Sequence, residues 1–158
     1  MSPEARQVRR ARPTDLPEVM AIERECFVEP WDEEVFAQTL EWTPFHFFVA
    51  LVDGRIRGFV VGCLEATGSA TYGHISNLGV TTPYRGRGIG RLLVARLEQQ
   101  FIVDGAEGVL LEVRVSNTPA QEFYRRLGYE DAFLLSGYYS NGEDALVMMK
   151  EIPPITAR

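Results

Sequence analysis

The sequence predicts a single mixed α/β (α+β) domain, with a mostly antiparallel sheet of about six to seven strands, one central parallel pair, and about four flanking helices. The strand–helix–strand order from Thr71 to Val115 indicates the parallel pair, because parallel neighbours need a crossover connection. Turn residues at Asp53-Gly54 and Ser140-Asn141-Gly142 separate strand-like runs and indicate antiparallel hairpins. A length of 158 residues, 46% apolar and 24% charged, fits one domain over 1–158 with its core over about 7–152.

Composition excludes several classes of protein. No stretch reaches the roughly 18 uninterrupted apolar residues of a membrane span, and the start of the chain lacks the apolar region of a secretory signal. Cys26 and Cys63 are far apart, which excludes a disulfide scaffold or zinc cluster and is typical of a reducing compartment. A net charge of −6 argues against nucleic-acid binding. We expect a cytoplasmic protein with flexible ends at Met1–Ala5 and Pro153–Arg158.

Strands are predicted where apolar and β-branched residues run between turn residues. These runs are Gln7–Ala11, Phe45–Val52, Ile56–Leu64, Thr71–Val80, Val109–Val115, Tyr129–Tyr139 and Glu143–Ile152. Alternation along the fourth run places His74 on the same face as Tyr72, Ser76 and Leu78. Along the fifth run it places Glu112 opposite Leu111 and Val113.

Helices are predicted where apolar residues recur at helical spacing. The first is capped by Thr14 and carries Leu16, Met20, Ile22, Cys26 and Phe27 before Pro30. The second runs from Asp32 to about Glu41, and the third from Ile89 to Phe101 before Asp104-Gly105. The fourth opens with a capping-box pattern at Thr118–Gln121, buries Ala120, Phe123, Tyr124 and Leu127, and ends at Gly128.

The most informative stretch lies between the fourth strand and the third helix. It contains Arg85, Gly86, Arg87, Gly88 and Gly90. Glycines let the backbone curl closely, and the free N–H groups at a helix start, with the helix dipole, favour an anion such as pyrophosphate. The two arginines would add positive charge at the rim. A glycine-rich turn that binds no ligand is the plainer alternative.

The residue sequence of this turn excludes two common phosphate-binding motifs. A Walker A loop needs a Gly-Lys pair, which the chain lacks. The pattern G-x-G-x-x-G fails from Gly86 and from Gly88, because Arg91 and Leu93 occupy its last position. The spacing Arg-x-x-Gly-x-Gly fits Arg85–Gly90, which closely resembles the coenzyme A pyrophosphate signature of the GNAT superfamily of N-acetyltransferases.

This resemblance implies a GNAT fold with acetyl-CoA as cosubstrate and no metal. The cofactor-binding residues that it implies are Leu78, Gly79, Val80, Arg85, Gly86, Arg87, Gly88, Ile89, Gly90, Asn117 and Tyr124. In the family's pattern Asn117 hydrogen-bonds to the pantetheine arm and Tyr124 points at the thioester sulfur. Gly79 fits a β-bulge that would expose backbone to pantetheine, and a backbone N–H near residues 78–80 would stabilise the oxyanion.

Acetyl transfer needs a neutral amine, a stabilised oxyanion and a proton for the leaving thiolate. An α-amino group has a pKa of about 7.7–8.0, against about 10.4 for lysine, so an N-terminus needs only a modest base. The strand around Glu112 resembles that of the ribosomal-protein alanine N-acetyltransferases (RimI-like), whose matching glutamate is the general base. Their general acid is a tyrosine twelve residues later, which is Tyr124 here. The resemblance implies that both residues are catalytic.

Each candidate has a plainer alternative. A salt bridge to Arg114 on the same face would account for Glu112. Tyr124 lies beside Phe123 on the apolar face of its helix, so it could simply be a core residue. His74 is a rival base, because an ordinary imidazole titrates near neutral pH, although a lone strand histidine is often structural.

Two flanking segments indicate the acceptor. Phe27–Asp32 resembles the Phe-x-x-Pro-Trp-Ser element of the same enzymes, and Tyr138–Ala145 resembles their Tyr-Tyr-x-x-Gly-Glu-Asp-Ala stretch, which archaeal and eukaryotic Nα-acetyltransferases share. There, this hairpin closes over the peptide backbone. The resemblance therefore implies that Phe27, Trp31, Tyr138 and Tyr139 bind substrate, and it runs from about Gln7 to Ile152.

We therefore expect transfer of acetyl from acetyl-CoA to a protein N-terminus, such as that of a ribosomal protein, by direct attack. Cys26 and Cys63 lack a matched histidine partner, so an acyl-enzyme is not favoured. The expected partner is a protein or peptide N-terminus, with no nucleic acid and no membrane, and the chain is expected to be a monomer or weak dimer. The alternatives are a lysine or small-amine N-acetyltransferase and a non-catalytic acetyl-CoA-binding sensor.

Overall fold

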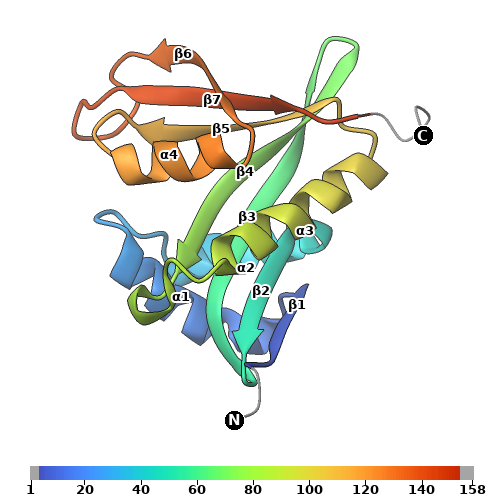
Figure 1. The fold of residues 1–158 in the computed structure, drawn as a ribbon, viewed down its shortest axis with the longest axis vertical. Coiled ribbons are helices and arrows are strands. Elements are labelled where there is room, and N and C mark those ends of the chain that lie inside the picture. Colours follow the sequence, from blue (N-terminus) through green and yellow to red (C-terminus); the bar gives the residue numbers. More distant parts are fainter. Residues whose placement is uncertain (1–3, 154–158) are drawn as a thin grey trace. The chain divides into compact units, whose positions relative to one another are not determined.

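The computed structural model describes residues 4–153 and gives a mixed sheet with helices (Figure 1). The strands are β1 (Arg6–Arg10), β2 (Phe47–Val52), β3 (Arg55–Thr67), β4 (Ala70–Val80), β5 (Gly108–Arg114), β6 (Glu130–Leu135) and β7 (Ala145–Glu151). The helices are α1 (Leu16–Cys26), α2 (Glu33–Trp42), α3 (Ile89–Val103) and α4 (Thr118–Arg126), and 3-10 turns cover Pro13–Asp15, Pro44–His46 and Thr82–Tyr84. Of the two predicted flexible ends, residues 1–3 and 154–158 lie outside the described residues.

The strand order is β1-β2-β3-β4-β5-β7-β6. Strands β4 and β5 pair in parallel, whereas β1–β2, β2–β3, β5–β7 and β6–β7 pair antiparallel. The predicted fold class is thereby confirmed. The chain divides into two compact units, Met1–Cys63 with Asn77–Gln100 and Leu64–Ser76 with Phe101–Arg158. Over residues 4–153, no helix is long and apolar enough to cross a membrane.

In the first unit, α1 and α2 cover one face of β2 and β3, and α3 covers the other (Figure 1). The first face holds an apolar cluster that includes Val19, Ile22, Phe36, Phe47, Val49, Phe59 and Val61. On the second face Phe48 lies under the guanidinium of Arg96, 4.4 Å from ring centre to carbon. Gly58 admits α3 closely, since a Cβ there would come within 3.1 Å of Leu93. Successive side chains of β2 therefore pack into two separate layers of the core, one on each face of the sheet.

The predicted hairpin at Asp53-Gly54 is confirmed. Both residues have positive φ, 50° and 81°, as a tight hairpin turn between β2 and β3 requires. Strand β2 begins at Phe47 rather than at Phe45, because the 3-10 turn Pro44–His46 precedes it.

Two predicted helix caps are wrong. Thr14 lies in a 3-10 turn, and α1 takes Asp15 as its N-cap, whose carboxylate accepts from Arg12 N–H at 2.7 Å. Helix α4 is capped by Asn117, not Thr118, with Oδ1 accepting from the N–H of Ala120 at 3.2 Å. Helix α2 begins where predicted, with Asp32 as its N-cap. Short polar side chains compete for this role, and the local path of the backbone decides which one reaches.

In the second unit, β7 lies between β5 and β6. Strand β4 enters it over Tyr72–His74, which pair with Gly108–Leu110. Gly73 is required there, because a Cβ would overlap the ring of Phe101. Strand β6 ends at Leu135, so the predicted strand through Tyr139 is too long.

Candidate functional site

The glycine-rich turn of the first unit has the conformation that its sequence predicts. Strand β4 ends at Val80, and α3 begins at Ile89. Gly86 and Gly88 have φ of +75° and +85°, a backbone conformation that residues other than glycine rarely adopt. The N–H of Leu92 bonds to the carbonyl of Gly88 at 3.1 Å, so the hydrogen bonding of α3 starts at Gly88. The first N–H groups of a helix favour an anion in general.

Both arginines of the turn contact residues that are distant in sequence. Arg85 folds back: its Nε donates to the carbonyl of Val80 at 2.9 Å, and its Nη2 lies 3.0 Å from Sγ of Cys26. Burial raises the pKa of the Cys26 thiol, although Arg85 opposes this, so the sulfur is neutral. Arg85 therefore ties the end of β4 to the end of α1.

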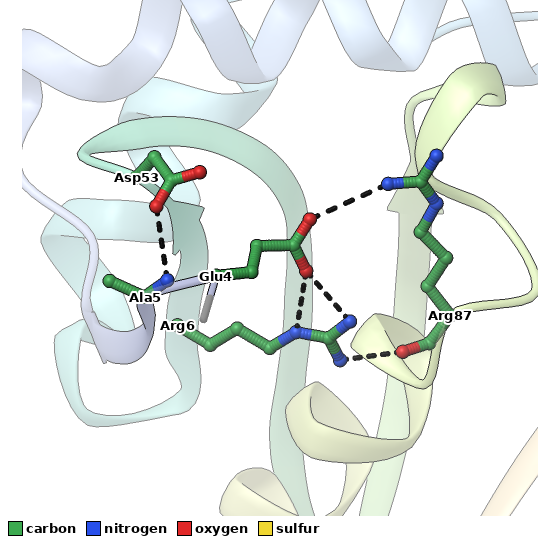
Figure 2. Close-up of polar contacts among 5 residues, drawn as sticks. All are labelled: Glu4, Ala5, Arg6, Asp53 and Arg87. Atoms are coloured by element: carbon green, nitrogen blue, oxygen red, sulfur yellow. Dashed lines mark hydrogen bonds and ion pairs between the residues drawn. The ribbon is translucent and has the colours of Figure 1, made fainter. Parts of the chain in front are cut away.

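Arg87 is held by the start of the chain (Figure 2). Its Nη1 lies 3.4 Å from Oε1 of Glu4, and its carbonyl accepts a hydrogen bond from Nη1 of Arg6. Glu4 also pairs with Arg6 at 2.9 Å. The N–H of Ala5 donates to Asp53 Oδ1 at 3.0 Å, so Glu4 and Ala5, expected in a flexible end, are fixed in place. The Glu4 carboxylate thus contacts Arg87 where a phosphate oxygen was expected.

Gly79 has a packing reason to be glycine. A Cβ there would come within 2.8 Å of the ring of Phe59 and within 3.2 Å of Ile22. Strand β4 continues through it to Val80. Along β4, Gly73, Ile75, Asn77 and Gly79 are buried, whereas Tyr72, His74, Ser76 and Leu78 are half-buried, as the predicted alternation requires.

In the second unit, His74 lies between two carboxylates. Its Nε2 is 2.8 Å from Oε1 of Glu112, and its Nδ1 is 2.9 Å from Oε1 of Glu65. The parallel register explains this, because His74 pairs with Leu110, and Glu112 is the next residue on that face of β5. An imidazole can donate to both carboxylates only as the doubly protonated cation. The structure thus unites two predicted residues and adds Glu65.

The alternative salt bridge from Glu112 to Arg114 is not formed, since Arg114 pairs with Glu143 at 3.0 Å and stacks 4.0 Å from the ring centre of Tyr139. The O–H of Tyr138 donates to Glu112 Oε1 at 3.3 Å. Burial and the nearby carboxylate raise the pKa of Tyr138, and burial raises the pKa of Tyr139 to about 12, so both phenols keep their protons.

Hydrogen bonds to two acidic side chains hold the loop that carries Tyr138 and Tyr139. Glu143 accepts from the N–H of Ser116 at 2.9 Å, and Asp144 accepts from the N–H of Gly137 at 2.9 Å. Gly142 has φ of +88°, and its N–H bonds to the carbonyl of Tyr139 at 2.8 Å. The hydrogen bonds of Gly142, Glu143 and Asp144 thus fix the loop, and they hold the half-exposed Tyr138 beside Glu112.

Tyr124 and Asn117 belong to α4 and its cap. Tyr124 is 7% exposed, with ring centres 5.0 Å from Phe123 and 5.6 Å from Tyr129. Burial raises its pKa, so its O–H stays protonated. The cap uses only Oδ1 of Asn117, which accepts from the N–H of Ala120, and does not involve the amide NH2 group.

The two predicted substrate residues of the first unit differ in exposure. Phe27 is 36% exposed, whereas Trp31 is half-buried with its ring centre 5.3 Å from that of Phe36. Trp31 therefore packs against the apolar cluster of the first unit, whereas the side chain of Phe27 is more exposed.

Sequence reasoning missed Glu4, Arg6 and Glu65. Glu4 lay in an expected flexible end, and Glu65 lay just beyond a strand predicted to stop at Leu64, whereas β3 continues to Thr67. Alternation past Leu64 was the signal that could have placed Glu65 on one face with Cys63.

Comparison with known proteins identifies the family. Residues 16–129 match the model of the acetyltransferase (GNAT) family. An uncharacterised N-acetyltransferase of Methanocaldococcus jannaschii is 39% identical, with 92% of each chain covered. An N-alpha-acetyltransferase of Sulfurisphaera tokodaii is 36% identical, with 90% of each covered.

A solved structure agrees. The ribosomal-protein-S18-alanine N-acetyltransferase from Escherichia coli superimposes with a TM-score of 0.79 at 28% identity, covering 94% of each chain. The chain belongs to the GNAT acetyltransferase family, and within it lies close to archaeal N-alpha-acetyltransferases and RimI-type S18-alanine acetyltransferases.

Proposed function

We propose that this chain transfers the acetyl group of acetyl-CoA to the N-terminal α-amine of a protein, with Glu112 as general base and Tyr124 as general acid. The amine nitrogen forms the new C–N bond while the thioester C–S bond breaks. The amine proton passes to Glu112, and the departing thiolate takes the proton of Tyr124. The similarity to Nα-acetyltransferases and S18-alanine acetyltransferases supports the reaction class and makes a ribosomal protein a candidate substrate.

The observation that carries the proposal is the contact between Glu112 and His74 at 2.8 Å. A half-buried strand carboxylate that pairs with a titratable side chain, rather than with an arginine, can accept a proton and pass it on. As the neutral tautomer that donates Nδ1–H to Glu65, His74 can accept that proton at Nε2 and so serves as the relay. We assign to the amine the second oxygen of Glu112, since both contacts of this carboxylate are to Oε1.

The cofactor side rests on the turn Arg85–Gly90. Its positive-φ glycines and the start of α3 suit a pyrophosphate. Asn117 keeps an amide donor that suits the pantetheine arm. The proposed proton transfers use side chains alone and need no metal.

An N-terminal amine is favoured as acceptor on acid–base grounds. It loses its proton near pH 8, so a carboxylate–imidazole pair is a strong enough base to deprotonate it, whereas a lysine amine needs a stronger base. Tyr138, which donates to Glu112, would lie beside the incoming backbone. Free cysteines at 26 and 63 suit a cytoplasmic setting.

Mass spectrometry tests the proposal with three peptides of one sequence: free N-terminus without lysine, blocked N-terminus without lysine, and blocked N-terminus with lysine. We expect acetylation of the first alone. Acetylation of the third would make the chain a lysine acetyltransferase. Binding of CoA without any turnover would make it a sensor.

A further inference from the structure

The mechanism makes no use of Glu23, although Glu23 is the most deeply buried acidic residue described. It lies on α1 with 1% of its surface exposed. Burial raises its pKa, while hydrogen bonds from Trp31 and Asn77 lower it in part. No arginine, lysine or histidine pairs with it within residues 4–153. A buried carboxylate without a cation is expensive, so its hydrogen bonds must account for it.

Each oxygen of Glu23 accepts a hydrogen bond from a different segment. Oε1 accepts from Nδ2 of Asn77 on β4 at 2.6 Å, and Oε2 accepts from the backbone N–H of Trp31 at 2.9 Å. Both partners are donors, and a carboxylate is the side chain that offers two acceptors and no donor. The residue type therefore matches the two-donor environment.

Through Trp31, Glu23 fixes the loop 27–32 that joins α1 to α2. The loop is tied at its start by the N–H of Phe27, which bonds to the carbonyl of Glu23 at 3.0 Å. It is tied at its end by Asp32, which caps α2. Glu23 thus holds the middle of the loop, where the Trp31 ring also packs on Phe36.

The loop presents apolar side chains outward. Phe27 is 36% exposed and Val28 is 95% exposed. These two side chains are neighbours on a loop that is tethered at three points, and they could contact another chain without rearrangement of the loop. In the proposed function that other chain is the substrate peptide.

We propose that Glu23 is a positioning residue: by holding the Trp31 main chain against Asn77, it sets the place of loop 27–32 and thereby which protein N-termini are accepted. The inference rests on the proposed function, since it takes the loop as part of the peptide-binding surface. It predicts that weakening the Glu23–Asn77 contact changes peptide selectivity and leaves acetyl-CoA binding alone.

A residue swap tests this. In Asn77→Asp, a second carboxyl group faces Glu23 and the donor to Oε1 is lost. In Glu23→Gln with Asn77→Asp, the new amide donates to the new carboxylate at position 77, and the amide oxygen accepts from Trp31. The contact is thus restored with its direction reversed. Kinetics use a panel of peptides that differ in their first two residues, with KM for acetyl-CoA measured separately.

We expect Asn77→Asp to raise the peptide KM by about tenfold, unequally across the panel, because small misplacements of binding groups have effects of this order. The KM for acetyl-CoA should stay within about twofold, and the double variant should recover both affinity and selectivity. Hydrogen exchange of the Trp31 amide should quicken in the single variant and slow again in the double. Ile56→Val removes one methyl group from a buried side chain of β3; it controls for lost stability alone and should leave selectivity unchanged.

A double variant that folds to the same Tm but does not regain selectivity would overturn the inference. So would equal effects of Asn77→Asp and Ile56→Val across the panel. If the unmodified protein acetylates no free N-terminus, the proposed function falls and takes the substrate role of the loop with it. Normal turnover with unchanged selectivity removes this inference alone.

Discussion

Nε2 of His74 lies 2.8 Å from Oε1 of Glu112, and the two residues come from strands β4 and β5, which pair in parallel. Glu65 contacts the other ring nitrogen at 2.9 Å. The imidazole is therefore oriented from one side and coupled to the candidate base on the other. A group held in this way can move a proton away from Glu112 without leaving its place.

If these residues act as a unit, their substitutions will not be additive. Glu112→Gln should lower kcat by about 100-fold or more, and His74→Gln by about tenfold, the usual range for general acid–base groups. The double variant should be no more than about threefold worse than Glu112→Gln alone. Steady-state kinetics at saturating acetyl-CoA measure this. Glu122→Gln, which removes an exposed carboxylate from α4, is the control and should keep full activity. Multiplying losses would contradict the relay.

Tyr124→Phe separates catalysis from packing. The ring contacts with Phe123 and Tyr129 do not need the hydroxyl, so we expect Tm to change little. Losing the proton donor should reduce kcat by about tenfold to 100-fold. Thermal unfolding and kinetics on one preparation provide both numbers. An unchanged kcat would leave Tyr124 as a core residue and require another acid.

Glu4 and Arg6 should affect acetyl-CoA binding in opposite directions. Glu4 places a negative charge on Arg87, beside the proposed pyrophosphate site, so Glu4→Gln should tighten binding by about two- to fivefold. Arg6 supports the carbonyl of Arg87 and adds positive charge, so Arg6→Gln should weaken binding by a similar factor. Both effects should shrink at high salt, because exposed charges are screened.

Calorimetric titration with CoA measures these affinities. Arg10→Gln, on the same strand and stacked on Phe45, is the matched control and should leave the affinity unchanged. If Glu4→Gln and Arg6→Gln both weaken binding, the start of the chain only supports the turn, and Glu4 does not compete with phosphate for Arg87.

The sequence allowed the faces of strands to be predicted, but not their register. Alternation placed His74 and Glu112 correctly on their strands, yet their contact depends on the pairing of His74 with Leu110, which periodicity does not encode. The turn Arg85–Gly90 was predictable because glycine has a local conformational role. The directions of Arg85 and Arg87 were not, because long side chains go to partners, here Cys26 and Glu4, that are distant in sequence.

Asp15 contrasts with Glu23, because its buried carboxylate has a cation. Arg9 pairs with it at 2.7 Å, and the N–H of Arg12 donates to it at 2.7 Å. Burial alone would raise the pKa of Asp15, but these hydrogen bonds and the charge of Arg9 outweigh it and hold the pKa below its ordinary value. A lowered folded-state pKa means that the stabilisation is complete above the pKa of the unfolded chain and is lost as pH falls through the folded one.

Asp15→Asn should therefore be less stable than the unmodified protein by about 1–3 kcal/mol at neutral pH, since the amide places a donor against the donors of Arg9 or Arg12. The difference should shrink as pH falls below about 4, where the aspartate itself becomes protonated. Urea unfolding at both pH values measures it. Asp131→Asn, which removes an exposed pair with Arg125, should show a much smaller difference at neutral pH because solvent screens that pair. A gap for Asp15→Asn that stays constant with pH would mean that the carboxylate acts through shape rather than charge.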